Sequence, residues 1–337
     1  MFWETQITSL IALFWDWGQI NINKMDKNSK EWSSKAPGYI IFLVDQSGSM
    51  IESYPEKGNK ANFTALVINR TINELISINM DGELPKNRVF ISIIGYGGKG
   101  GNSIDEIRSD FLGNFADKPL RMEVGKQKVS DGNGGLVEIN VDNAIFIEPV
   151  ANGLTPMGNA LEYAKKLIED WLSDKPKNPA PIVINISDGM PYNGNNDDSE
   201  EIKSIEEANF IMNLRCEDGN PLIFNAHIGN GPQKCICSSS ESELPDEQAK
   251  FLFKISSKIP KSYQKAAEKE GLSVQHDSRG FVSNADPDTF IKFISFGSSG
   301  GQVDKSSEKK DMSSDENKGI SNENVSNDDN DDSWMNF

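Results

Sequence analysis

The sequence is poor in cysteine and histidine, with three and two residues respectively among 337. An odd number of cysteines does not suggest the disulfide framework of a small secreted protein. Cys235 and Cys237 could form a redox or metal pair, but only His227 and His276 could add imidazole ligands. A zinc site is therefore disfavoured, and ordinary buried or loop thiols are the simpler interpretation.

Positive charge is also scarce, because 34 Lys and Arg stand against 51 Asp and Glu for a net charge of −17. The chain lacks the broad basic surface that nucleic-acid phosphates and anionic membranes require, so neither is expected as a partner. A partner with a basic patch is favoured instead.

Hydrophobic runs long enough to cross a membrane are missing as well. Residues 1–22 hold several tryptophans and the run Leu10–Phe14, but this stretch is too short to span a bilayer and has no basic start, as a secretory signal would. We interpret it as a short helix or strand that packs on the domain or on a partner, and we expect a cytoplasmic protein.

The chain does contain a continuous apolar run, Ile40–Val44, which ends in Asp45 and is followed by Ser47 and Ser49. Such a run is typical of a strand buried on both faces. In open α/β sheets, ligands bind beyond the carboxyl ends of the strands, and hard oxygen ligands suit Mg²⁺. A polar turn leaving a strand is the alternative interpretation of this motif alone.

Two later segments carry similar signals. The run 181–186 is a second apolar strand, and it ends in Ser187 and Asp188. Near residue 153 a helical pattern begins, with Thr155 predicted as the N-cap and Pro156 as the first helical residue.

Five residues, each at a strand end or a helix start, resemble the metal-ion-dependent adhesion site of von Willebrand factor type A domains: Asp45, Ser47, Ser49, Thr155 and Asp188. The resemblance covers about residues 38–297. Leu154–Gly158 and Ser187–Pro191 look most like the intracellular bacterial branch, which includes tellurite-resistance-associated proteins.

The resemblance implies a non-enzymatic module that binds a protein partner in a bacterial stress-response, signalling or defence system. Ser47, Ser49 and Thr155 would offer hydroxyls to Mg²⁺, with Mn²⁺ or Ca²⁺ as alternatives, while Asp45 and Asp188 would act largely through waters and hydrogen bonds. The ion would then accept an Asp or Glu side chain from the partner. Candidate contacts on the rim are Tyr192, Asn193, Glu52 and Tyr54.

The order of strand and helix signals predicts an α/β fold with a doubly wound, mostly parallel sheet flanked by helices. Residues 1–37 form an N-terminal extension and linker, 38–297 the domain, and 298–337 a tail. A turn at 131–135 predicts a hairpin between 122 and 139, placed on the edge of the sheet. Helices are expected at 60–79, 156–173, 199–215, 246–269 and 286–296, and strands at 39–45, 88–94, 181–187, 222–228 and 280–282.

The tail holds ten acidic and four basic side chains and few apolar ones, a composition typical of disorder. It ends in an acidic run followed by Trp334, Met335 and Phe337. These aromatic and Met side chains could dock on a second partner, or the segment could simply be a solvating tail.

Three other functions fit parts of the sequence. A Mg²⁺-dependent phosphatase or phosphotransferase could use Asp45 as its nucleophile, although it would not need both serine hydroxyls. A structural scaffold would act through its termini. The stretch Gly95–Gly100 fits a dinucleotide-binding pattern, but no clean helix follows it.

Overall fold

The computed structural model describes residues 28–54, 58–130 and 136–299. The predictions for residues 1–22 and for Trp334, Met335 and Phe337 lie outside this part of the chain, as does the turn at 131–135.

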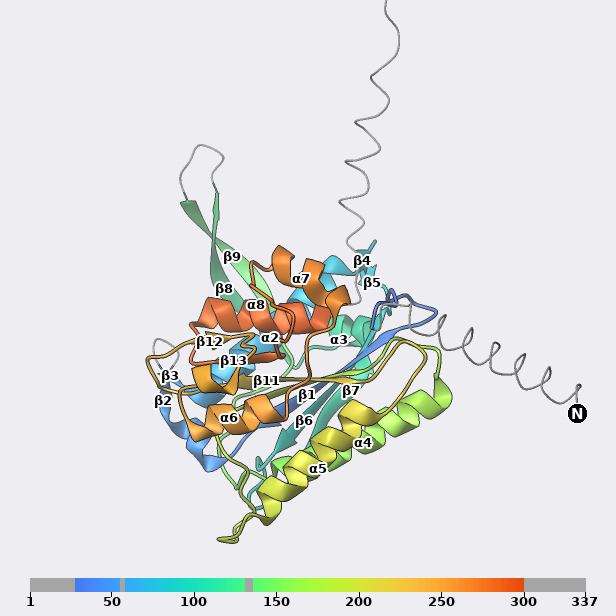
Figure 1. Ribbon diagram of the computed structural model, residues 1–337. Helices are drawn as coiled ribbons and strands as arrows, with labels where there is room; N and C mark the ends of the chain where they lie inside the picture. The colour runs from blue at the N-terminus through green and yellow to red at the C-terminus, as the bar shows by residue number, and fades with distance from the viewer. Residues whose placement is uncertain (1–27, 55–57, 131–135, 300–337) are drawn as a thin grey trace, which may run out of the picture. The chain divides into compact units, whose positions relative to one another are not determined.

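A seven-stranded sheet forms the centre of the domain, in the order β12-β13-β11-β10-β1-β6-β7 (Figure 1). The five inner strands are parallel to one another, and the two outermost strands run antiparallel to their neighbours. The predicted doubly wound, mostly parallel α/β sheet is confirmed. The strands are β1 Gly38–Asp45, β6 Val89–Tyr96, β7 Ile104–Phe111, β10 Ile182–Ser187, β11 Leu222–His227, β12 Cys235–Ile236 and β13 Phe281–Ser283.

Helices cover both faces of the sheet (Figure 1). On β1, Ile40 and Phe42 pack into one core and Ile41 and Leu43 into the other, which is why the strand is apolar at every position. One face is covered by α2 Lys60–Ile78, α3 Leu112–Asp117, α7 Gln264–Lys269 and α8 Pro287–Ser299, and the other by α4 Met157–Asp174, α5 Ser199–Asn213 and α6 Glu247–Lys254. Short 3₁₀ turns are η1 Gly48–Ile51, η2 Glu241–Glu243 and η3 Lys261–Tyr263.

The hairpin β8 Arg121–Ser130 and β9 Leu136–Ile145 exists as predicted, but its expected place on the sheet edge is wrong. It forms a separate two-stranded sheet against α2, where Asn69 and Asn73 donate hydrogen bonds to the carbonyls of Ile147 and Ala144. The edge of the seven-stranded sheet beside β6 is β7, a strand that the sequence patterns did not predict. Two further small sheets pair β2 Ser53–Tyr54 with β3 Gly58–Asn59, and β4 Met80–Asp81 with β5 Leu84–Pro85.

Two other expectations need correction. The single helix over 246–269 is wrong, because α6 ends at Lys254 and the chain turns before Pro260, whose ring disfavours a helical residue before it. The described part of the predicted linker, 28–37, packs on the domain. Trp32 is buried, and its ring lies where a Cβ on Gly38 would stand.

Among the described residues, no helix combines the length and the hydrophobicity needed to cross a bilayer.

Candidate metal site

Asp45 lies at the carboxyl end of β1, and its side chain is buried beneath the site. Its Oδ1 accepts the backbone N–H of Ser47 at 2.9 Å, and its Oδ2 accepts the hydroxyl of Ser187 at 2.6 Å. Burial raises the pKa of Asp45 to about 6, and the charge of Asp188 adds to the increase, while the bonds from Ser187 and Ser47 oppose it. The carboxylate is thus costly to hold ionised without a nearby cation.

A chain of oxygens leads outward from this carboxylate. The hydroxyls of Ser47 and Ser49 lie 3.0 Å apart, and Ser49 donates to Oδ1 of Asp188 at 2.8 Å. Four of the predicted ligands, Asp45, Ser47, Ser49 and Asp188, are therefore brought together by the ends of β1 and β10.

Thr155, the fifth predicted ligand, also lies at the site, but the contact that holds it there is not the expected one. Its predicted role as N-cap is wrong, since α4 begins at Met157 with Pro156 in the cap position. The backbone of Thr155 instead pairs with Tyr192, in two N–H···O bonds of 3.0 and 2.9 Å. This pairing holds Thr155 at the wall of a cavity that Ser49 and Asp188 also line.

Backbone hydrogen bonds tie the loops around the site. Gly48 donates to the carbonyl of Gly153 at 2.9 Å, and Gly153 donates to that of Gly97 at 2.8 Å. Gly97 has φ +82°, and a Cβ there would lie 2.2 Å from the carbonyl oxygen of Leu154. The glycine-rich stretch after β6 thus supports the site's loops.

Lys60 is the main residue of the site that sequence reasoning missed. Its ammonium bonds Oδ2 of Asp188 at 2.8 Å and Oε2 of Glu52 at 2.6 Å, and its side chain is only 6% exposed. Burial would lower the pKa of Lys60, but these bonds outweigh it and the pKa is raised. One signal was available: a lysine in the first turn of a helix opposes the helix dipole and so calls for a partner.

A cavity of about 430 Å³ opens at the site, lined by Ser49, Thr155 and Lys60 among others. Three carboxylates line it, those of Glu52, Asp188 and Asp246, against a single ammonium from Lys60. His227 adds no charge at neutral pH, because burial lowers its pKa, and its Nδ1 bonds the hydroxyl of Ser283 at 2.8 Å. The cavity is therefore electronegative as it stands.

A polar ladder crosses the sheet beneath the site. Tyr96 donates to Asn185 at 3.0 Å, Asn185 donates to Asn225 at 2.9 Å, and Asn225 donates to Ser256 at 2.9 Å. All of these side chains are buried. The ladder links β6, β10 and β11 to the end of α6.

Three of the four candidate rim residues are exposed or half-buried, and the fourth is buried in the core. Tyr192 is 42% exposed, and Glu52 is exposed and paired with Lys60. Asn193 is half-buried and bonds Ser199 at 2.9 Å. The prediction for Tyr54 is wrong, because its ring is buried against Phe63 at 4.6 Å and its hydroxyl donates to a core carbonyl.

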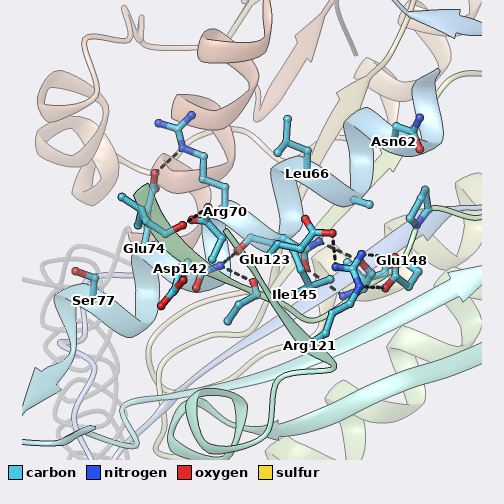
Figure 2. Close-up of a pocket in the computed structure, with 18 residues that line it drawn as sticks. Asn62, Leu66, Arg70, Glu74, Ser77, Arg121, Glu123, Asp142, Ile145 and Glu148 are labelled. Atoms are coloured by element: carbon cyan, nitrogen blue, oxygen red, sulfur yellow. Dashed lines mark hydrogen bonds and ion pairs between the residues drawn. The ribbon is translucent and has the colours of Figure 1, made fainter. Parts of the chain in front are cut away.

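A larger cavity of about 860 Å³ lies elsewhere, between α2 and β9 (Figure 2). It shares no lining residue with the site. Several of its charged groups form ion pairs: Arg121 contacts Glu123 and Glu148, and Arg70 lies 3.4 Å from Glu74.

Within the described residues, no group of three or more His, Cys, Asp and Glu side chains could hold a metal ion. Any ion at this site would therefore need the serine and threonine hydroxyls as ligands.

Comparison with known proteins gave matches only among solved structures. No family model and no curated protein matches the chain. The von Willebrand factor domain of the type V pili tip protein Mfa5 from Porphyromonas gingivalis is 12% identical, with a TM-score of 0.39 over 80% of this chain and 98% of that domain. The mussel byssus proximal thread matrix protein 1 is 14% identical, with a TM-score of 0.37. The minor pilin PilB from Streptococcus sanguinis is 13% identical, with a TM-score of 0.41. Each of these two is matched over 79% of this chain, which spans 48% of the mussel protein and 62% of the pilin. The likeness concerns the fold alone.

Proposed function

We propose that this chain is a non-enzymatic protein-binding module that holds Mg²⁺ at Ser47, Ser49 and Thr155 and recognises an acidic side chain of a partner protein. The observation that carries the proposal is the hydrogen-bonded chain of Ser47, Ser49 and Asp188 beside buried Asp45, with Thr155 lining the same cavity as Ser49 and Asp188. Their order along the chain also resembles the adhesion site of von Willebrand factor type A domains.

The donor set fits Mg²⁺ on geometry as well as on chemistry. Octahedral Mg²⁺ holds its oxygens at about 2.0–2.1 Å, so adjacent ligands lie about 3 Å apart. The hydroxyl oxygens of Ser47 and Ser49 are separated by 3.0 Å. Both oxygens of Asp188 already accept hydrogen bonds, which supports a role for Asp188 around the ion rather than as a direct ligand.

When bound, Mg²⁺ would supply an electrophilic centre for a carboxylate oxygen. The protein's own residues would set the strength of that centre. Asp45 offers its charge from below, through the N–H of Ser47 and the hydroxyl of Ser187. Because neutral hydroxyls are the proposed direct ligands, little of the ion's charge is neutralised within the site.

The surroundings of Asp45 favour binding over phosphoryl transfer. A nucleophilic carboxylate must reach its substrate, but Asp45 is 1% exposed and both of its oxygens are engaged in hydrogen bonds. The proposal therefore assigns Asp45 an electrostatic role and no covalent one.

The proposal is tested by titrating the full chain with Mg²⁺ in a calorimeter, beside a variant that combines Ser47→Ala and Ser49→Ala. The variant should lose about 100-fold in Mg²⁺ affinity, since even outer-shell changes cost metal sites about 10–100-fold. Ser242→Ala, an exposed serine, is the matched control and should bind Mg²⁺ like the unmodified chain.

Partner recognition is tested by a pull-down from native lysate in Mg²⁺ and in EDTA. Retention that requires Mg²⁺ and both serines supports the module. A partner that is retained equally under all conditions would indicate that the protein acts through another part of its surface. Phosphate release that depends on Mg²⁺ and on Asp45 would favour the phosphatase alternative.

A further inference from the structure

Lys60 is the only lysine or arginine among the residues that line the metal-site cavity. A buried ammonium requires charged or polar partners, and Lys60 has two. Its side chain is 6% exposed, and it lies between the carboxylates of Asp188 and Glu52.

These two carboxylates differ in how firmly they are held. Asp188 is 3% exposed and also accepts the hydroxyl of Ser49, so it belongs to the fixed part of the site. Glu52 is 55% exposed and stands at the mouth of the cavity. The backbone N–H of Lys60 bonds the carbonyl of Glu52 at 3.0 Å, so the two residues stay adjacent even when the Glu52 side chain moves away.

We propose that Lys60 is the protein's own anchor for the partner's carboxylate, and that Glu52 occupies this anchor until the partner displaces it. The inference rests on the proposed function, because it assumes that the partner presents an acidic side chain to this cavity. Lys60 is a specificity-determining residue in this view, and Glu52 is an intramolecular competitor.

The exchange carries no large penalty because it replaces one carboxylate by another of the same chemistry. The ammonium of Lys60 keeps two carboxylate partners throughout, so no buried charge is left alone. Glu52 moves into solvent from a position that is already half open, which costs little. A partner lysine or arginine would meet the ammonium of Lys60 as a like charge, so the anchor selects acidic side chains.

Acetate is the probe for the test, because it carries the proposed chemistry and no other group. The full chain is loaded with Mn²⁺, and acetate binding is followed through the paramagnetic relaxation of its methyl protons. Charged hydrogen bonds contribute about 1.5–3 kcal/mol each, equivalent to about tenfold or more in affinity. Lys60→Met should therefore weaken acetate binding about tenfold or more.

Glu52→Gln should tighten acetate binding several-fold, because an amide competes poorly for the ammonium. Glu123→Gln is the matched control. Glu123 is also 55% exposed and paired with a cation, but it lines the other cavity. It should leave acetate binding unchanged.

Metal affinity gives a second readout with the opposite sign. Removing a positive charge beside the site should make Lys60→Met bind Mg²⁺ more tightly in a calorimetric titration, while acetate binds more weakly. A purely structural lysine would lower both affinities together with the melting temperature. If Lys60→Met does not fold, Glu52→Gln carries the test, because that change lies on an exposed side chain.

The two proposals fail in different ways. Metal-dependent acetate binding that is the same in Glu52→Gln and Lys60→Met as in the unmodified chain overturns the anchor and leaves the proposed function standing. Absence of Mn²⁺ binding, or of any acetate effect in the unmodified chain, overturns the proposed function and the anchor with it.

Discussion

Replacing Asp45 by Asn should stabilise the protein when no metal is present. The carboxyl pKa of about 6 in the fold, against an ordinary 3.8, means that ionised Asp45 opposes folding at neutral pH. A shift of about two units at about 1.4 kcal/mol each is on the order of 3 kcal/mol. Asparagine keeps the shape, and it can still accept the N–H of Ser47 and donate to the hydroxyl of Ser187.

The pH dependence follows from the direction of the shift. A carboxyl whose pKa is raised on folding adds stability in its protonated form, fully below pH about 4, and this contribution is lost as the pH rises through about 6. In EDTA, Asp45→Asn should therefore melt about 6 °C or more above the unmodified chain at pH 7.5, for a domain of this size. The difference should shrink at pH 5.

Thermal denaturation followed by circular dichroism measures this, with Asp277→Asn, an exposed carboxylate, as the control. Under the proposed function, added Mg²⁺ should raise the melting temperature of the unmodified chain, because it would bind only the folded state. It should leave the melting temperature of Asp45→Asn unchanged. An Asp45→Asn variant that is less stable than the unmodified chain by the same amount at pH 5 and pH 7.5 would refute the reasoning.

Two further predictions concern the loops and the hairpin. Gly97→Ala should destabilise the fold by about 2 kcal/mol or more, because φ at Gly97 is positive and the carbonyl oxygen of Leu154 leaves no room for a Cβ. Urea unfolding measures this loss of stability. An unchanged unfolding midpoint would contradict the prediction. Asn69→Ala should cost about 2–4 kcal/mol, because its side chain bonds the N–H groups of Phe146 and Ile147 and the Ile147 carbonyl. Hydrogen exchange should then accelerate at the amides of Phe146 and Ile147. Exchange there that rises only with global unfolding would argue against a local role.

Much of the candidate site could be predicted because its residues follow local patterns. The apolar run before Asp45 and the one before Ser187 and Asp188 both belong to inner strands of a parallel sheet, and the carboxyl ends of parallel strands meet at one edge. Residues 142 positions apart, such as Asp45 and Ser187, are thereby brought within 2.6 Å.

Lys60 could not be assigned from the same patterns. Its partner Asp188 is 128 residues away, and no local rule links a helix start to a strand end on another part of the sheet. Only the unfavourable position of a lysine in the first turn of α2 hinted at a buried ion pair.

Thr155 and Tyr54 show how tertiary contacts override local signals. The sequence around Thr155 is a strong helix start, yet its backbone pairs with Tyr192 and moves the helix start by two residues. Tyr54 follows the serine motif and so looked like a rim residue, but the ring of Phe63 draws it into the core. The break before Pro260, in contrast, was readable from the sequence.

The ladder of buried amides also fixes the alignment of the strands. Asn185 and Asn225 are direct neighbours in the pairing of β10 with β11. A slip of one residue would turn one amide to the opposite face and leave both with unmet hydrogen bonds in the core. An apolar pair would tolerate such a slip far better. The ladder thus selects a single pairing of β10 with β11.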